Sequence, residues 1–529
     1  MASDSGAGNA FWVDRLADEV VSAFPNASLY RTENGIGASG LPHIGSVSDA
    51  VRSYCVSLAL TSRGLRAEHI AYSDDKDGLR KVPKGMPESL ARYIGVPVTS
   101  VPDPEGCHSS YGQHMGGLLL SALDRLGIKY TPISATEMYR SGALNPQIHL
   151  ILTQWKKVGQ IIYEETGQEK YLHTLPYMAV CGGCGRIYTT TVRNYDPKTQ
   201  TVSYECSGGE IGGKASPGCG FSGERSLSQG EGKLAWKTEF AARWAALGIS
   251  FEAYGKELTS SIRTNDRICQ EILGVKPPVH TRYELFITKE GKKMSKSSGD
   301  LITAETWLRY GSPQSLLLLM LKRFEGTRAI GVEDIPVYMG ELDRLEDLYF
   351  GKATVTDEAE RRDKILLFRY VNLLNPPQKP SLHPPYNLLT YLATTAPKHD
   401  PVNFILSKLK AYGYASNDPD QEKDLLARIE FALNWVRDRN EVAATATLSS
   451  EDRELVFEVL KKLEAKNDEQ GYQSAVYEAA KDIGTEPKRV FLAVYRALLG
   501  ADSGPRLGAY ISAMGKSNVL NRLREAVGA

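Results

Sequence analysis

Residues 35–46 read GIGASGLPHIGS, and this glycine-rich stretch decides the fold. A helical pattern follows at once, because apolar side chains recur at three- and four-residue steps from Val47 to Leu58. Glycines let the backbone approach a ligand closely, and the N-terminus of a helix offers free N–H groups to an anion. The stretch therefore predicts a phosphate-binding turn before a helix over 47–60, with Ser46 as the N-cap and His43 beside the phosphate.

A short apolar strand is predicted at Ala67–Ser73, and the acidic run DDKDGLRK follows it at 74–81. Strand, glycine-rich turn, helix and strand together open a doubly wound parallel sheet. Acidic groups directly after the second strand would lie at the carboxyl edge of that sheet, where such folds bind ligands. A plain polar turn is the alternative explanation of the acidic run.

A cationic loop reads KKMSKSSG at 292–299, after a strand-like run at 283–287 and a polar turn at 289–291. Such a loop at the end of a strand is suited to close over a polyphosphate. It would neutralise charge while a phosphorus centre is attacked. A solvated basic loop is the alternative.

Composition bounds the possible partners and compartment. The chain has 529 residues, enough for roughly two to four domains. Lys plus Arg and Asp plus Glu both number 63, so a nucleic-acid partner would have to meet local basic patches. No apolar run approaches the length of a membrane span, and residues 1–10 have no apolar core of a signal peptide. We therefore expect a cytoplasmic protein.

Four of the seven cysteines gather in a glycine- and serine-rich segment: Cys181, Cys184, Cys206 and Cys219. Their spacing suits a tetrahedral zinc site that staples a small insertion. The odd number and low density of cysteines argue against a disulfide scaffold, and free buried thiols are the alternative. His108 and His114 could bind nucleotide or substrate, or form structural hydrogen bonds.

Trp236 and Glu239 lie one helical turn apart after the cysteines. An aromatic ring and a carboxylate would suit a cationic amino-acid side chain, and a core role for Trp236 is the alternative. Residues 364–529 look mainly helical, and basic residues gather from 484 to 524. This pattern fits a helical nucleic-acid-binding module, with a solvated helix face as the alternative.

The stretches HIGS at 43–46 and KMSKS at 293–297 resemble the two signature motifs of class I aminoacyl-tRNA synthetases. Four more stretches are similar to class I lysyl-tRNA synthetases: SDDKDGLRKVP at 73–83, VPDP at 101–104, KLAW at 233–236 and GPRLG at 504–508. The resemblance runs from about Leu29 to the C-terminus.

The resemblance implies an α/β Rossmann-like parallel-sheet catalytic domain with a small zinc-bearing insertion, followed by an all-α C-terminal anticodon-binding domain. The implied segments are an N-terminal extension (1–25), two catalytic halves (26–170 and 233–300), the zinc insertion (171–232), a stem-contact module (301–350) and the anticodon-binding domain (351–529).

The same resemblance implies ATP-dependent ligation of L-lysine to tRNA(Lys) through a lysyl-adenylate, with Mg²⁺ and structural Zn²⁺, and we expect a monomer. The implied catalytic residues are His43, Gly45, Ser46, Lys293, Ser295, Lys296 and Ser297. The implied ATP contacts are Gly40, Pro42, Gly255, Glu257 and Met294. The implied lysine pocket is Gly35, Trp236, Glu239 and Tyr283, and the implied zinc ligands are Cys181, Cys184, Cys206 and Cys219.

Several pocket positions depart from the usual family pattern: Gly37, Glu239, Phe240 and Leu258. Three rivals follow: a class I ligase for another amino acid such as glutamate, a paralogue that transfers lysine to a non-tRNA acceptor, and a non-catalytic zinc-ribbon protein. The carboxylate of Glu239 argues against the first, the long helical C-terminal region against the second, and the two ATP motifs against the third.

Overall fold

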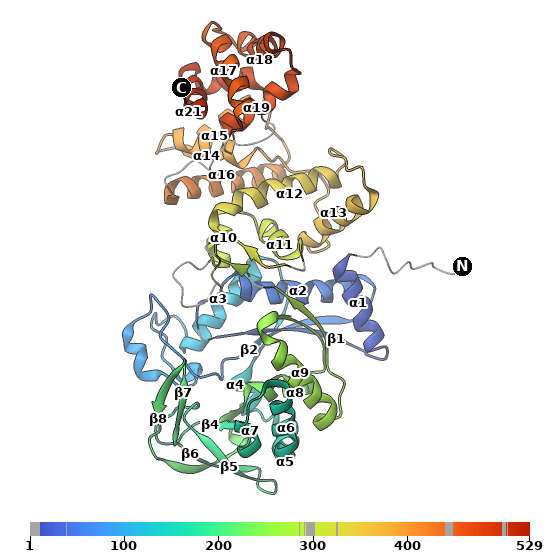
Figure 1. Ribbon diagram of the computed structural model, residues 1–529, viewed down its shortest axis with the longest axis vertical. Helices are drawn as coiled ribbons and strands as arrows, with labels where there is room; N and C mark the ends of the chain where they lie inside the picture. The colour runs from blue at the N-terminus through green and yellow to red at the C-terminus, as the bar shows by residue number, and fades with distance from the viewer. Residues whose placement is uncertain are drawn as a thin grey trace, which may run out of the picture. The chain divides into compact units, whose positions relative to one another are not determined.

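The computed structural model describes residues 11–38, 40–284, 286–289, 291, 302–323, 326–439, 448–499, 504 and 506–528. It divides into two compact units. Figure 1 shows the chain coloured by residue number, from blue at the N-terminus to red at the C-terminus. The first unit comprises residues 1–305, 317–331 and 369–375, and the second comprises 306–316, 332–368 and 376–529. Each unit is described below by itself.

A five-stranded parallel sheet organises the first unit, in the spatial order β12-β11-β1-β2-β3. Its strands are β1 (Tyr30–Ile36), β2 (Ala67–Ser73), β3 (Thr131–Ser134), β11 (Ile249–Gly255) and β12 (Val279–Tyr283). This is the doubly wound arrangement, and the strand order reverses between β1 and β11. The predicted parallel sheet is confirmed, and ligands of such folds bind outside the carboxyl ends of the strands at this reversal.

The helix after the glycine-rich turn, α2 (Ile44–Ser62), begins earlier than the sequence predicts. Its N-cap is His43 and not Ser46, because His43 Nδ1 accepts a hydrogen bond from the Gly45 N–H at 3.0 Å. Ser46 instead lies in the first turn, where its N–H donates to the His43 carbonyl at 2.8 Å. A Cβ atom at Gly45 would lie 2.6 Å from His43 Cε1, so this cap requires glycine.

The two faces of the sheet carry different chemistry. On one face the His69 ring of β2 packs 5.8 Å from the Tyr54 ring of α2, and His69 also contacts Thr32 of β1. The next residue, Glu33, points to the opposite face, because side chains alternate along a strand. There it meets Arg243 of α8 (Trp236–Leu247).

Between β3 and β11 the chain leaves the sheet and builds an insertion. The antiparallel pair β4 (Tyr177–Ala179) and β10 (Gly232–Leu234) closes it. Inside lie an antiparallel sheet of β5 (Thr191–Asp196), β6 (Thr201–Glu205) and β9 (Ser222–Ser226), and the hairpin of β7 (Gly208–Ile211) and β8 (Lys214–Pro217). The other helices of the first unit up to β12 are α1 (Trp12–Ala23), α3 (Tyr111–Arg125), α4 (Ala135–Arg140), α5 (Asn145–Thr153), α6 (Trp155–Thr166), α7 (Lys170–His173) and α9 (Thr259–Ile268).

The run predicted as one strand at 283–287 is divided between two strands. β12 ends at Tyr283, and β13 (Phe286–Ile287) pairs in parallel with β14 (Arg328–Ala329). The predicted turn follows, with Gly291 at φ +77° and its N–H bonded to the Thr288 carbonyl at 2.9 Å. Residues 292–301, which hold the whole cationic loop, lie outside the described residues.

Beyond this point the described chain is helical apart from β14. The helices are α10 (Ala304–Tyr310), α11 (Pro313–Leu321), α12 (Ile335–Tyr349), α13 (Glu358–Val371), α14 (Tyr386–Thr395), α15 (Pro401–Ala411), α16 (Pro419–Arg439), α17 (Ser450–Glu464), α18 (Glu469–Ile483), α19 (Pro487–Leu499), α20 (Leu507–Met514) and α21 (Lys516–Val527). Apolar residues of α14 to α21 form one core of the second unit. In the described part of the chain, no helix combines the length and apolarity needed to cross a membrane.

Candidate active site and metal centres

The N-terminus of α2 contacts the described chain that follows the cationic loop. The Ile44 N–H donates to the Ile302 carbonyl at 3.0 Å, directly beside His43. Ile302 is the first described residue after the cationic loop. Ile302 is therefore hydrogen-bonded to the first residue of α2. Lys293, Met294, Ser295, Lys296 and Ser297 lie outside the described residues, and their roles stay predictions.

The predicted nucleotide contacts lie along the same edge of the sheet. Gly40 and Pro42 belong to the turn between β1 and α2, and Gly255 ends β11. A Cβ atom at Gly255 would lie 2.5 Å from Oε2 of Glu257, so this carboxylate folds back over the strand end. The sheet register pairs Gly255 with Tyr283, the last residue of β12.

The predicted lysine pocket places Glu239 in an unexpected environment. Its side chain is fully buried, and its Oε2 lies 2.7 Å from Nζ of Lys233. Its Oε1 accepts a hydrogen bond from the Tyr139 hydroxyl at 3.0 Å. Burial raises the pKa of Glu239, and Lys233 opposes that rise. Glu239 thus already has a cation from the protein, and its contact with a substrate ammonium stays a prediction.

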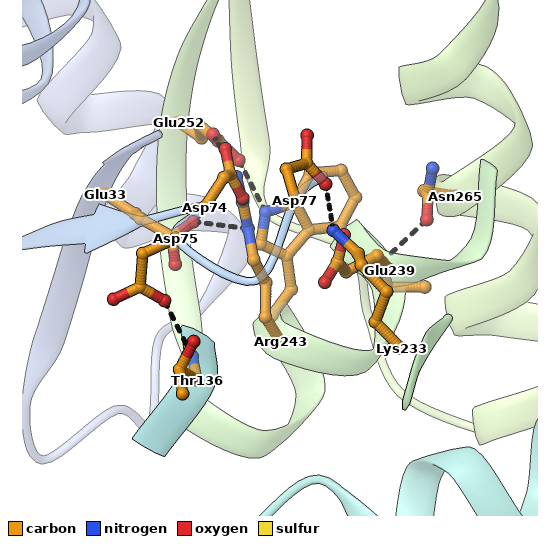
Figure 2. Close-up of polar contacts among 12 residues, drawn as sticks. Glu33, Asp74, Asp75, Asp77, Thr136, Lys233, Glu239, Arg243, Glu252 and Asn265 are labelled. Carbon is orange, nitrogen blue, oxygen red and sulfur yellow. Dashed lines mark hydrogen bonds and ion pairs between the residues drawn. The ribbon is translucent and has the colours of Figure 1, made fainter. Parts of the chain in front are cut away.

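A second buried cation, Arg243, was not singled out by sequence reasoning. Its guanidinium lies 2.6 Å from Glu33 of β1, 2.7 Å from Glu252 of β11 and 3.3 Å from Asp74 after β2 (Figure 2). Burial raises the pKa of Asp74 to about 7 and raises the pKa of Glu33 well above its usual value, although Arg243 lowers both. Among the predicted pocket residues, Gly35 lies closest to this cluster: a Cβ atom there would lie 3.5 Å from Asp74 Oδ2.

The four predicted zinc ligands are brought together by the insertion. Cys181 and Cys184 follow β4, Cys206 follows β6, and Cys219 precedes β9, with all four Sγ atoms within 4.8 Å of one another. The Cys181–Cys219 and Cys184–Cys206 sulfur pairs are 3.6 and 3.8 Å apart. Four sulfurs at the ordinary zinc–sulfur distance of about 2.3 Å would be spaced by about 3.8 Å in a tetrahedron. The arrangement can hold a metal ion.

A second group of potential metal ligands consists of Asp103, Cys107, His108 and His114. Cys107 Sγ lies 3.1 Å from His108 Nδ1 and 3.2 Å from His114 Nδ1, and Asp103 Oδ1 lies 3.3 Å from His114 Nδ1. Sequence reasoning treated the two histidines separately and missed the group. The available signal was a cysteine, a carboxylate and two histidines within one short loop.

Two family models match the chain. One, described as tRNA synthetases class I (K), matches residues 10–372, and one described as an anticodon binding domain matches residues 423–527. A lysine–tRNA ligase of Cenarchaeum symbiosum (strain A) is 44% identical over 524 residues and covers 98% of each chain. One of Rickettsia bellii (strain OSU 85-389) is 30% identical over 521 residues and covers 97% of this chain and 96% of its own. Among solved structures, a glutamate–tRNA synthetase of Elizabethkingia anophelis covers 94% of this chain and 100% of its own. Its 12% identity and TM-score of 0.37 carry no argument.

Proposed function

Because the chain belongs to the class I lysyl-tRNA synthetase family, we propose that it ligates L-lysine to tRNA(Lys) with ATP, releasing AMP and pyrophosphate. The observation that carries this proposal is the 44% identity to a lysine–tRNA ligase along almost the whole chain. The hydrogen bond between Ile44, in the first predicted ATP motif, and Ile302, which follows the second motif in the chain, supports it.

The reaction would proceed in two displacements. A lysine carboxylate oxygen attacks the α-phosphorus of ATP, and the bond to pyrophosphate breaks. A terminal hydroxyl of the tRNA then attacks the adenylate carbonyl carbon, and AMP leaves. The start of α2, with His43, Gly45 and Ser46, would bind phosphate oxygens, because the helix dipole places partial positive charge at this end. Lys293 and Lys296 would neutralise the triphosphate, and Mg²⁺ would supply further positive charge.

The segments predicted from the sequence complete the proposal. Residues 26–170 and 233–300 would form the catalytic domain, with 171–232 as its insertion and 1–25 as an extension. Residues 301–350 would contact the tRNA stem, and 351–529 would bind the anticodon. The match of an anticodon binding domain to residues 423–527 supports the last assignment.

We also propose metal ions at both ligand groups. Zinc suits the four cysteines, because a closed tetrahedral thiolate site stabilises a small insertion. The group at Asp103 offers oxygen, sulfur and nitrogen donors that zinc also accepts. Metal analysis of the purified full-length protein should find two zinc ions per chain, and His114→Ala should lose one of them. A single ion in the wild type would contradict the second assignment, and none would contradict both.

Pyrophosphate exchange, measured with each amino acid in turn and with tRNA present, tests the reaction and its substrate. We expect exchange with lysine and with no other amino acid. Exchange driven by glutamate, or no exchange with any amino acid, would contradict the proposal. The same assay with tRNA(Lys) and with a non-tRNA acceptor distinguishes a paralogue from a tRNA ligase.

The cationic loop is tested by Lys296→Ala. Its charge should act mainly in the transition state, so its loss should slow adenylate formation by a few hundred-fold, or about 3–4 kcal/mol. Lys289→Ala, in the turn before the loop, is the matched control and should stay near the wild-type rate. Wild-type exchange kinetics in Lys296→Ala would remove this lysine from the mechanism.

A further inference from the structure

Two neighbouring groups of buried charges contain more carboxylates than cations. The Arg243 group consists of Arg243, Glu33, Asp74 and Glu252, and the Lys233 group consists of Lys233, Asp77 and Glu239. Figure 2 shows these seven side chains, and Asp77 also pairs with the half-exposed Arg80 at 3.4 Å. Among the described residues, five carboxylates therefore share three cations. Each of these side chains except Asp77 and Arg80 is more than nine-tenths buried. Surplus buried negative charge is costly unless a further cation or protons neutralise it.

Buried polar atoms without partners lie in the same place. The Tyr72 hydroxyl and Glu33 Oε2 have no hydrogen-bond partner among the described residues, and both side chains are fully buried. The Arg243 guanidinium lies 4.8 Å from the centre of the Tyr72 ring. Burial and the neighbouring carboxylates Glu239 and Asp74 raise the pKa of Tyr72. Native proteins rarely leave such atoms unpaired, so this position is prepared for a group that donates hydrogen bonds.

Asp74 is the member of the Arg243 group that lies at the sheet edge. It directly follows β2, and Gly35 on the neighbouring strand is only half-buried. A Cβ atom at Gly35 would meet Asp74 Oδ2 at 3.5 Å and Arg243 Nη2 at 3.6 Å, which are ordinary contact distances. Because Gly35 has no side chain, the space beside its Cα adjoins the Asp74 carboxylate on a residue that is itself partly exposed to solvent. This is the edge at which doubly wound sheets bind ligands.

An apolar surface adjoins the same group. The rings of Trp236 and Phe240 on α8 lie 4.6 Å apart, edge to face, and the Arg243 guanidinium lies 4.2 Å from the Phe240 ring. Methylene groups could pack here while a terminal cation reaches the carboxylates. A primary ammonium fits better than a guanidinium, because it is a compact charge with three donors.

We propose that Asp74 binds the side-chain ammonium of the lysine substrate, with the Tyr72 hydroxyl as a second contact. The inference rests on the proposed function and deepens it by naming the specificity-determining residue. Glu33 and Glu252 also pair with Arg243 and hold it in place. Because three carboxylates share this one guanidinium, it neutralises the charge of Asp74 only in part. Glu239 is then a positioning residue that acts through Lys233, since both of its oxygens already have partners.

The decisive variant is Asp74→Asn, which removes the charge and keeps the shape. In the metal-loaded full-length protein with tRNA present, KM for lysine should rise at least about tenfold and KM for ATP should stay unchanged. Binding of lysine by calorimetry should weaken by the same factor. Binding of norleucine, which lacks the ammonium, should change less than twofold.

Asp75→Asn is the matched control, one residue further along the chain. Asp75 accepts hydrogen bonds from the Ser134 hydroxyl at 2.6 Å and the Thr136 N–H at 2.8 Å, which fasten the start of α4. This variant should lower the melting temperature and leave KM for lysine unchanged. Equal effects of the two variants on KM would overturn the proposal.

A second pair of variants keeps the test decisive if Asp74→Asn folds poorly. Gly35→Ala adds a methyl group at ordinary contact distance, so it should fold normally and raise KM for lysine about tenfold. Gly340→Ala, where a Cβ atom meets nothing within 4 Å, should change neither property. Unchanged lysine affinity in both Asp74→Asn and Gly35→Ala would overturn the inference. Absence of lysine-dependent exchange in the wild type would instead contradict the proposed function.

Discussion

Two buried carboxylates, one in each unit, have pKa values shifted in opposite directions. In the second unit, Asp452 of α17 is 3% exposed and lies between two arginines of α19, Arg489 and Arg496. Burial alone would raise the pKa of Asp452, but hydrogen bonds from these arginines lower it below its usual value. In the first unit, Asp74 shares Arg243 with two other carboxylates, and burial raises its pKa to about 7.

The difference separates structural charge from charge prepared for a ligand. A carboxylate between two cations is satisfied within the folded chain, and here it joins its own helix, α17, to the helix that supplies them, α19. A carboxylate in a group with a surplus of acid stays poorly neutralised until a cation arrives. The pKa shifts of the two carboxylates accordingly run in opposite directions, downward for Asp452 and upward for Asp74.

The largest effect is expected when Asp452 loses both arginines. The double variant Arg489→Ala/Arg496→Ala leaves a buried carboxylate unpaired and should lower the free energy of unfolding by about 2 kcal/mol. This is less than the roughly 3–5 kcal/mol for fully buried pairs, because the arginines are partly exposed. Chemical denaturation measures the loss, and calorimetry should show unchanged lysine affinity. A loss of lysine affinity in this variant would contradict the assignment of a structural role to Asp452 and of a substrate-binding role to Asp74.

Lysine affinity should depend on pH through the Arg243 group. An ammonium needs the ionised form of Asp74, which with a pKa of about 7 is mostly protonated at about pH 6 and mostly ionised at about pH 8. Lysine should therefore bind about tenfold more weakly at the lower pH, by calorimetry. The charged or titratable groups around Asp74 are Glu33, Glu252, Arg243, Glu239, Lys233, Asp77, Arg80 and Tyr72.

Asp74→Asn is the control for this pH dependence and should flatten it. Without lysine, the same group acts on folding with the opposite sign. The folded pKa is raised, so its stabilising contribution is present at low pH and is lost as the pH rises through about 7. An unchanged pH dependence of lysine affinity in Asp74→Asn would assign the titration to another carboxylate.

The smallest effect is expected at an exposed pair of the second unit. Arg524 of α21 lies 2.7 Å from Glu464 of α17, and both side chains are about half exposed. Solvent screens such pairs, so Arg524→Ala should change the free energy of unfolding by less than about 0.5 kcal/mol. Chemical denaturation of Arg524→Ala and of Arg489→Ala/Arg496→Ala under the same conditions compares their losses in free energy of unfolding. A loss equal to that of the double variant would show that burial does not distinguish the two sites.

The sequence alone was sufficient for the features that depend on local pattern. A short apolar run predicted β2 at Ala67–Ser73, as observed, and apolar spacing at three- and four-residue steps predicted the position of α2 to within a few residues. Short motifs also predicted the family, because glycine turns and lysine–serine loops carry their chemistry in consecutive residues. The prediction of Ser46 as the N-cap of α2 was wrong, because the choice between His43 and Ser46 depended on a side-chain hydrogen bond within the turn.

Only the tertiary structure decided which charges meet. Glu33, Asp74 and Glu252 come from three separate strands and reach Arg243 because parallel strands place their side chains on one face. Glu239 looked available for a substrate because nothing near it in sequence reveals that Lys233 and Tyr139 fill its two oxygens. Ion pairing depends on distance and burial in space, and periodicity along the chain does not encode either. The sequence by itself therefore determined the family and its motifs, and the fold determined which acid is left for the substrate.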